Sequence, residues 1–190
     1  MRKLITALAV LALTLTACGG QEKDSNSSSS SPFNAADVAF ATGMIPHHAQ
    51  ALAMVDMTRN HELDPAVGQL RDDILDAQEP EIETMVAWLE SWGKPVPETG
   101  RGHDMGAMSD HTMNMPGMMS DKAMASLKKA HGADFQRMWL EMMREHHQGA
   151  LTMAKDEIDK GKFPKAIALA RSIVKGQTTQ IQRIERLLNS

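Results

Sequence analysis

This chain has almost no thiols, no tyrosine and no strand-forming sequence patterns. It has one cysteine, no tyrosine and 4% aromatic residues. A single cysteine excludes an intrachain disulfide, and its position at residue 18 leaves the rest of the chain without a thiol for catalysis or metal binding. The chain also lacks a glycine-rich phosphate loop and a basic stripe, and its formal net charge is −4. These features argue against nucleic-acid binding.

The amino-terminal region has the pattern of an exported lipoprotein. Two basic residues precede an apolar run from Leu4 to Leu15, which is too short to span a bilayer but suits the core of a signal peptide. Residues 15–18 read Leu-Thr-Ala-Cys and resemble a lipobox, with small residues before a cysteine. We predict a signal peptide over residues 1–17 and lipidation of Cys18, so that lipid alone attaches the chain to a membrane. An ordinary signal peptide that happens to end near a cysteine is the alternative.

The chain after the signal peptide divides into a tether and one domain. Residues 18–32 are rich in serine and polar side chains, so they are expected to form a flexible tether. Residues 33–190 are long enough for one well-packed domain, which includes a loop rich in methionine and histidine at 100–120. Without the two basic residues of the signal peptide, the formal net charge is −6.

The domain repeats itself at a constant offset of 99 residues. Residues 44–91 align without a gap on residues 143–190, and matches fall mostly three or four residues apart, which indicates helical faces. We predict helices over about 34–60, 65–92, 121–160 and 164–188, with a break near Gly132 left open. Short connections make each pair of helices a hairpin. Two hairpins that bury their apolar faces together predict an all-α four-helix bundle with a pseudo-twofold axis.

Two histidine pairs occupy equivalent positions in the repeat. Each pair lies on an inward helical face with methionines at helical spacing, and the two sets are Met44, His47, His48 and Met54, and Met143, His146, His147 and Met153. Imidazole binds several transition metals, whereas thioether sulfur favours soft ions such as Cu(I). The mixed set therefore predicts a copper site, with Cu(I) favoured over Cu(II). Buried structural histidines and packing methionines are the competing interpretation.

Two glutamines interrupt the apolar stripes of the second and fourth predicted helices. Gln78 and Gln177 are interpreted as residues that support the metal ligands by hydrogen bonding to histidine, although glutamines at the edge of the core would look the same. A di-iron bundle is disfavoured because the chain has no Glu-x-x-His motif.

The loop between the two hairpins is unusually rich in sulfur. Residues 103–119 hold six methionines and two histidines among glycines and polar residues, so core packing does not explain the methionines. Spaced thioethers on such a loop favour capture of a soft ion. A simple connector and a sacrificial target for oxidants remain alternatives.

The paired Met-x-x-His-His-x-x-Ala-x-x-Met motifs, each followed by a glutamine-containing helix, resemble the family named domain of unknown function 305. The resemblance covers about residues 34–190 and implies a ferritin-like helical bundle, common in exported bacterial proteins. Some members resemble periplasmic copper-binding proteins involved in copper tolerance. The family motif positions fall on Met44, His47, His48, Met143, His146 and His147.

Three functional hypotheses follow from the sequence. The favoured one is a non-enzymatic lipoprotein outside the cytoplasm that captures copper for buffering, tolerance or transfer to a partner protein. The second is a metal-dependent redox enzyme of the ferritin-like type. The third is a metal-free interaction lipoprotein whose methionines consume oxidants. Nothing in the sequence resembles a nucleophile with a positioned base, and the oligomeric state is left open.

Overall fold

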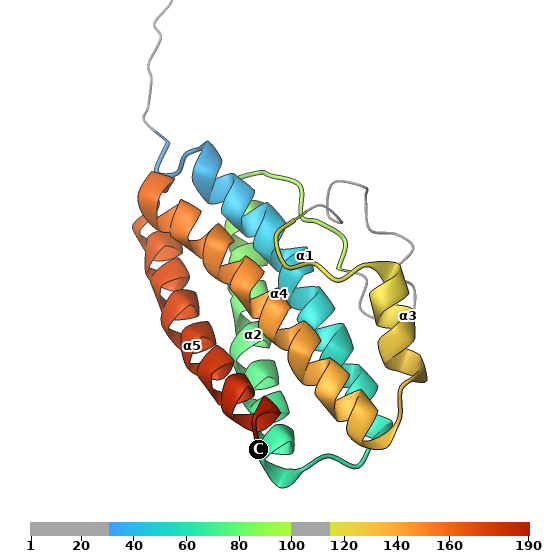
Figure 1. Cartoon of the computed structure of the whole chain (residues 1–190). Helices are drawn as coiled ribbons and strands as arrows, with labels where there is room; N and C mark the ends of the chain where they lie inside the picture. Colours follow the sequence, from blue (N-terminus) through green and yellow to red (C-terminus); the bar gives the residue numbers. More distant parts are fainter. Residues whose placement is uncertain (1–30, 100–114) are drawn as a thin grey trace, which may run out of the picture. The chain divides into compact units, whose positions relative to one another are not determined.

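A computed structural model describes residues 31–99 and 115–190, and the regular elements within these ranges are all helical (Figure 1). The predicted all-α bundle is confirmed. Cys18 and residues 100–114 lie outside the described ranges. The elements are α1 (Ala35–Met57), the short 3-10 helix η1 (Thr58–Asn60), α2 (Pro65–Ser91), α3 (Asp121–Lys129), α4 (Gly132–Lys160) and α5 (Pro164–Leu188).

Local sequence explains where the helices begin. Asn34 caps α1, because its side-chain oxygen accepts hydrogen bonds from the backbone N–H groups of Ala36 and Asp37. The Asp37 carboxylate in turn accepts a hydrogen bond from the backbone N–H of Asn34. Prolines occupy the first positions of α2 and α5, where a missing N–H costs nothing, as the sequence predicted.

The break near Gly132, which the sequence left open, is present. Helix α3 ends at Lys129, and α4 begins at Gly132, whose φ of 54° lies in the left-handed region. Because glycine adopts this conformation without a steric penalty, it lets the chain turn between the two helices. The break leaves α4 free to serve as the long third helix of the four-helix bundle.

Equivalent hydrogen bonds show the pseudo-twofold symmetry directly. Asp37 in α1 accepts from the backbone N–H of Phe163, at the start of α5, over 2.8 Å. The repeat equivalent is Gln136 in α4, whose side-chain oxygen accepts from the backbone N–H of Asp64, at the start of α2, over 2.7 Å. Each residue of one bond lies 99 positions from its counterpart in the other. The first helix of each hairpin thus secures the second helix of the other hairpin.

A polar layer divides the core of the bundle. The buried apolar side chains form two separate clusters, one containing Met54, Met143 and Trp139, the other Met44 and Met85. On each long helix, the chain passes from one cluster to the other through buried polar residues. These residues are His47, His48 and Gln50 on α1, Gln78 on α2, His146 and His147 on α4, and Gln177 on α5. Polar groups therefore meet midway along the bundle, where apolar packing would otherwise be continuous.

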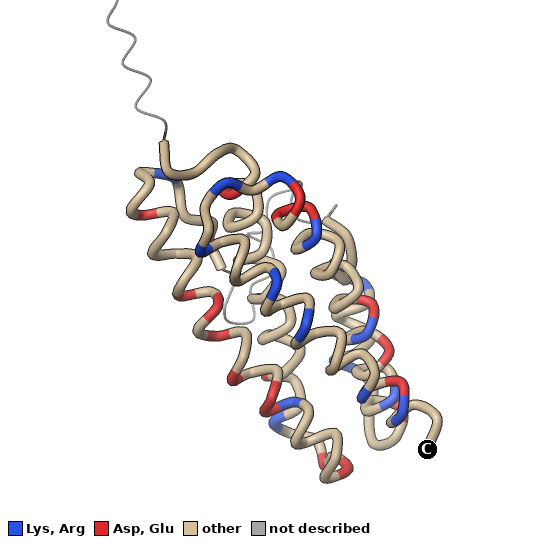
Figure 2. Tube along the Cα trace, turned by 90° about the vertical axis from the view of Figure 1, so that its left-hand side faces the viewer, with Lys and Arg blue, Asp and Glu red and all other residues tan. Residues whose placement is uncertain are grey.

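Charge is distributed unequally over the outer helices. Helix α2 carries seven acidic residues and one basic residue, whereas α5 carries five basic residues and one acidic residue (Figure 2). Arg183 of α5 donates to Asp73 of α2 over 2.7 Å and to the carbonyl oxygen of Ala66 over 2.9 Å, which ties the two hairpins together. Across the described part of the chain, we find no helix with the length and apolar character needed to cross a bilayer.

Candidate metal centre

The two first histidines of the repeated motif meet in the middle of the bundle. His47 on α1 and His146 on α4 are fully buried, and their ring centroids lie 3.8 Å apart with the planes tilted by 40°. Residues related by a twofold axis contact each other only near that axis. The His47–His146 pair therefore marks the pseudo-twofold axis, where the two repeated motifs meet.

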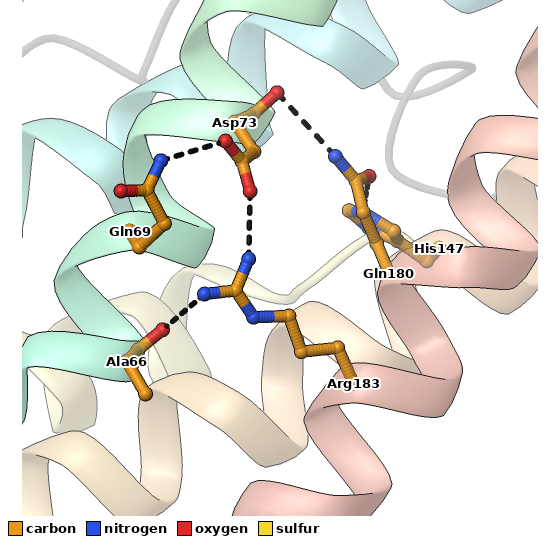
Figure 3. A network of polar contacts seen from close by, with 6 residues as sticks. All are labelled: Ala66, Gln69, Asp73, His147, Gln180 and Arg183. Carbon is orange, nitrogen blue, oxygen red and sulfur yellow. Dashed lines mark hydrogen bonds and ion pairs between the residues drawn. The ribbon is translucent and has the colours of Figure 1, made fainter.

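The second histidine of each pair hydrogen-bonds within its own hairpin. His48 Nε2 lies 2.7 Å from Glu81 Oε2, and His147 Nε2 lies 2.8 Å from Gln180 Oε1. Glu81 and Gln180 are equivalent positions in the repeat. Figure 3 shows that Gln180 also reaches the backbone oxygen of Asp73 on α2, so His147 is connected to the contact between the two hairpins.

These contacts correct one expectation from the sequence. Gln78 and Gln177 are buried, but the histidine hydrogen bonds go to residues one helical turn further on, at 81 and 180. Within residues 31–99 and 115–190, the side-chain amides of both glutamines have no hydrogen-bond partner. The histidines can bond residues 81 and 180 in place of 78 and 177 because side chains three residues apart lie on nearly the same face of a helix. A supporting role toward a bound ion stays a prediction for both glutamines.

Several buried imidazole nitrogens have no hydrogen-bond partner among the described residues. These are Nδ1 of His47, His48 and His147, and both ring nitrogens of His146. An unsatisfied buried polar group costs on the order of 1–3 kcal/mol, so most proteins avoid it. His146 is the most conspicuous case, because neither nitrogen of its imidazole makes a well-formed hydrogen bond, although the backbone of His47 lies close enough to act on the ring. A bound ion would use the acceptor nitrogens that the protein leaves free.

Burial keeps the imidazoles of His47, His146 and His147 neutral. Desolvation, with smaller contributions from neighbouring histidines, lowers the pKa of His47 to about 3 and the pKa of His146 well below its ordinary value. Desolvation also lowers the pKa of His147 to about 4, although its bond with Gln180 opposes the shift. Neutral imidazole is the form that binds metal ions, so no proton has to leave before ligation at neutral pH.

The four methionines that the sequence predicted as metal ligands differ in how deeply they are buried. Met44, Met54 and Met143 are fully buried in the two apolar clusters, while Met153 is partly exposed. Met153 Cε and Met115 Sδ approach the same point, 3.0 and 3.4 Å from where a Cβ on Gly43 would lie. Glycine at position 43 therefore leaves room for two thioethers beside α1. Met115 belongs to the sulfur-rich loop, so the structure identifies one loop methionine near a predicted core ligand.

In the described ranges, no three side chains of His, Cys, Asp or Glu are grouped so as to hold a metal ion. A site built from nitrogen and oxygen ligands alone is therefore not preassembled there. An ion at the His47–His146 pair would find two imidazoles there and would need further ligands of another type, for which thioether sulfur is one candidate.

The carboxyl end of the loop lies across the histidine pair. Residues 115–119, which we call the strap, run over α1 and α4 before α3 begins (Figure 1). Pro116 O lies 3.1 Å from His47 Nε2. The Gln50 amide makes two bonds to Met119, donating to its carbonyl oxygen over 2.8 Å and accepting from its N–H over 2.7 Å.

Sequence comparison between the repeats missed Gln50, Glu81 and Gln180, since it was based on identical or similar apolar positions. Glu81 and Gln180 differ in residue type, and Gln50 aligns with a glycine. A search for polar residues at equivalent positions would have found Glu81 and Gln180.

Comparison with known proteins places the chain in a family. The model of the family described as domain of unknown function (DUF305) matches residues 37–188, so the chain belongs to this family. A search of curated proteins gave no match.

Among solved structures, a DUF305 fragment from Deinococcus radiodurans is 31% identical, with a TM-score of 0.72, and the match covers 83% of this chain and 98% of that one. A DUF305 protein from Streptomyces coelicolor, assigned as secreted, is 32% identical with a TM-score of 0.69, covering 81% and 92%. CopM in the Cu(II)-bound form is 27% identical with a TM-score of 0.66, covering 80% and 95%. CopM has also been solved in Cu(I)-bound, silver-bound and apo forms.

Proposed function

We propose that this protein is a copper-binding lipoprotein outside the cytoplasm, which captures copper through its histidine and methionine side chains and buffers it or passes it on. The observation that carries the proposal is the pair of buried imidazoles on the pseudo-twofold axis, of which His146 has no hydrogen-bond partner in the described residues. In a purely structural histidine, hydrogen bonds offset the free-energy cost of burying the polar ring, as the bond to Glu81 does for His48.

The donor types favour copper over harder metals. Two neutral imidazoles and nearby thioethers suit Cu(I), whereas Mg²⁺, Ca²⁺ and Mn²⁺ prefer carboxylates and water. Met44 and Met143 precede the two contacting histidines by one helical turn, and Met153 follows His146 by two turns. The copper-bound and silver-bound structures of CopM support the same class of ion. Cu(II) is accommodated if the histidines supply most of the ligands.

Export and lipid attachment complete the proposal. Cys18 follows the lipobox-like sequence, and residues 19–32 are long enough to separate the bundle from a membrane surface. The secreted assignment of the Streptomyces coelicolor relative supports export. Lipidation of Cys18 would then be the means of attachment.

A redox enzyme is the less favoured function. Catalytic metal sites keep a ligand position open to a substrate, whereas all four core histidines are fully buried. An oxidant sink is also less favoured, because it explains exposed methionines but not buried imidazoles without partners.

Anaerobic Cu(I) titration tests the proposal. The chain from Gly19 to Ser190 is used, because it lacks the thiol of Cys18, which would itself bind Cu(I). The melting temperature is measured with and without copper buffered at about 100 times the dissociation constant. Binding to the folded state should then add about 2.7 kcal/mol, or roughly 5–10 °C for a domain of this size.

The decisive variant is His47→Gln with His146→Gln, which keeps side-chain bulk and polarity. It should melt near wild-type apo protein and lose most of the copper-induced rise. The control is His61→Gln with His131→Gln, which removes a second pair of neighbouring histidine rings, with centroids 6.0 Å apart. A core double variant that retains the full rise would show that the histidine pair does not bind copper.

A further inference from the structure

Two equivalent positions of the repeat, 50 and 149, carry very different residues beside the histidine pair. Gln50 and Gly149 occupy equivalent places, three residues after His47 and His146. Gln50 is fully buried, and its amide holds the backbone of Met119 through both an N–H donor and an oxygen acceptor. A side-chain amide that pairs with both backbone groups of one residue fixes the position of that residue as a neighbouring strand would.

Gly149 receives the other part of the strap. A Cβ at this position would overlap the carbonyl group of Pro116 and lie 2.6 Å from the Cα of Gly117. Gly117 has a φ of 76°, and a Cβ there would lie 2.7 Å from the carbonyl oxygen of Glu145. Both positions require glycine, because backbone meets backbone where the strap crosses α4. The difference between Gln50 and Gly149 is therefore explained by the strap, which lies against both.

The strap makes the two central imidazoles chemically different. The carbonyl oxygen of Pro116 can only accept a hydrogen bond, so Nε2 of His47 must carry the proton and Nδ1 is left as the free nitrogen. His146 makes no bond with the strap and no well-formed hydrogen bond among the described residues; only the backbone of His47 acts on its ring, and its effect on the pKa is outweighed by burial. The hydrogen bond on one ring nitrogen of a histidine decides which nitrogen is available to a metal.

We propose that Gln50 is a positioning residue: it holds the strap so that Pro116 fixes His47 with Nδ1 as its ligand nitrogen, and the strap must open before an ion exchanges at the histidine pair. The second half rests on the proposed copper-binding function, whereas the first concerns the metal-free protein. Opening is required because His47 and His146 are fully buried and the strap packs directly against α1 and α4 beside them.

Two variants disturb the strap from opposite sides. Gln50→Leu removes both bonds to Met119 at similar volume, and Gly149→Ala places a methyl group where the Pro116 carbonyl lies. Gly68→Ala and Gly176→Ala are matched controls, because these helical glycines have nothing within 4 Å of a new Cβ. Circular dichroism establishes that each variant is folded, and either strap variant alone suffices for the test.

The first measurement is the tautomer of His47 in the metal-free protein, from long-range nitrogen–proton correlation spectra at neutral pH. Wild type and both controls should show one tautomer, protonated at Nε2. Gln50→Leu and Gly149→Ala should show a mixture of both tautomers. A purely structural role for Gln50 would lower stability but leave the tautomer unchanged.

The second measurement is the rate at which Cu(I)-loaded protein transfers its ion to a colorimetric chelator without oxygen. The two strap variants should release Cu(I) about tenfold faster than wild type and controls, a change on the order of 1.4 kcal/mol in the barrier. The proposal requires both changes, so an unchanged tautomer or an unchanged release rate in the folded variants overturns it. If wild type binds no Cu(I), the proposed function fails, while the tautomer measurement still tests the strap.

Discussion

Replacement of one buried acid should change how stability depends on pH. Glu157 in α4 is 1% exposed and lies beside Asp37, the residue that joins α1 to the start of α5. Burial and the neighbouring Asp37 carboxylate raise the pKa of Glu157 from 4.5 to about 8. Burial opposes ionisation of Asp37 as well, but hydrogen bonds from backbone N–H groups outweigh it and lower the Asp37 pKa. At neutral pH the pair therefore holds one proton, on Glu157.

The sign of the effect follows from proton linkage. In the unfolded chain Glu157 ionises near pH 4.5, whereas in the folded chain it keeps its proton to about pH 8. Folding therefore takes up a proton in this range, and stability falls as the pH rises through it. At about 1.4 kcal/mol per pKa unit, the fall is on the order of 5 kcal/mol at most. The fall in stability is smaller if the contact between Asp37 and Glu157 relaxes and admits water above pH 8.

Glu157→Gln keeps the neutral shape of the protonated acid and cannot ionise. The variant should match wild type near pH 5 and exceed its free energy of unfolding by several kcal/mol at pH 8.5. Urea unfolding followed by far-ultraviolet circular dichroism measures both values on metal-free protein. The two proteins differ only at residue 157, so the difference between the curves reports on Glu157. Glu62→Gln, at an exposed position, serves as the control. Parallel curves for Glu157→Gln and wild type would refute the assignment of a buried proton.

Further predictions concern the anchor and the sulfur ligands. Cys18→Ser should leave the chain without lipid, and metabolic labelling with a fatty acid checks this; a labelled variant would contradict the lipobox. Met115→Leu with Met153→Leu keeps packing nearly constant and should weaken Cu(I) binding about tenfold in chelator competition, whereas Met142→Leu should not. Deletion of residues 103–114 spares the strap, so the bundle should melt within a few degrees of wild type while binding fewer Cu(I) ions. An unchanged ion count would make that segment a connector or an oxidant target.

The helices were predictable because local chemistry fixes them. Proline at the start of α2 and α5 gives the expected first residues, 65 and 164, and the Asn34 cap lets α1 begin at Ala35, one residue after the expected start. The apolar faces follow a helical period, and the constant offset makes the two hairpins equivalent. Equivalent motifs on a pseudo-twofold axis bring equivalent faces together, which accounts for the contact between His47 and His146 but could not be assigned to that pair from the sequence.

The polar contacts were not predictable in the same way. Gln78 and Glu81 lie on nearly the same face of α2, and only the packing of α1 against α2 decides which of them His48 reaches. Asp37 looks like an ordinary capping residue, and its contact with Glu157 spans 120 positions of the sequence. Periodicity reports which face of a helix is buried, but it does not report which buried polar groups meet.

The strap shows how a repeated fold obtains a single, unsymmetrical site. Two identical hairpins would present two equivalent imidazoles at the axis, each with the same choice of tautomer. One segment that crosses the axis cannot treat both halves alike, so it bonds His47 and leaves His146 without that bond. Glycine at 149 leaves space for the strap to lie against α4, and glutamine at 50 binds the strap to α1. If the proposed copper site forms, a fixed tautomer at His47 and the lack of that bond at His146 would let an ion stay bound on one side while its ligands on the other side exchange.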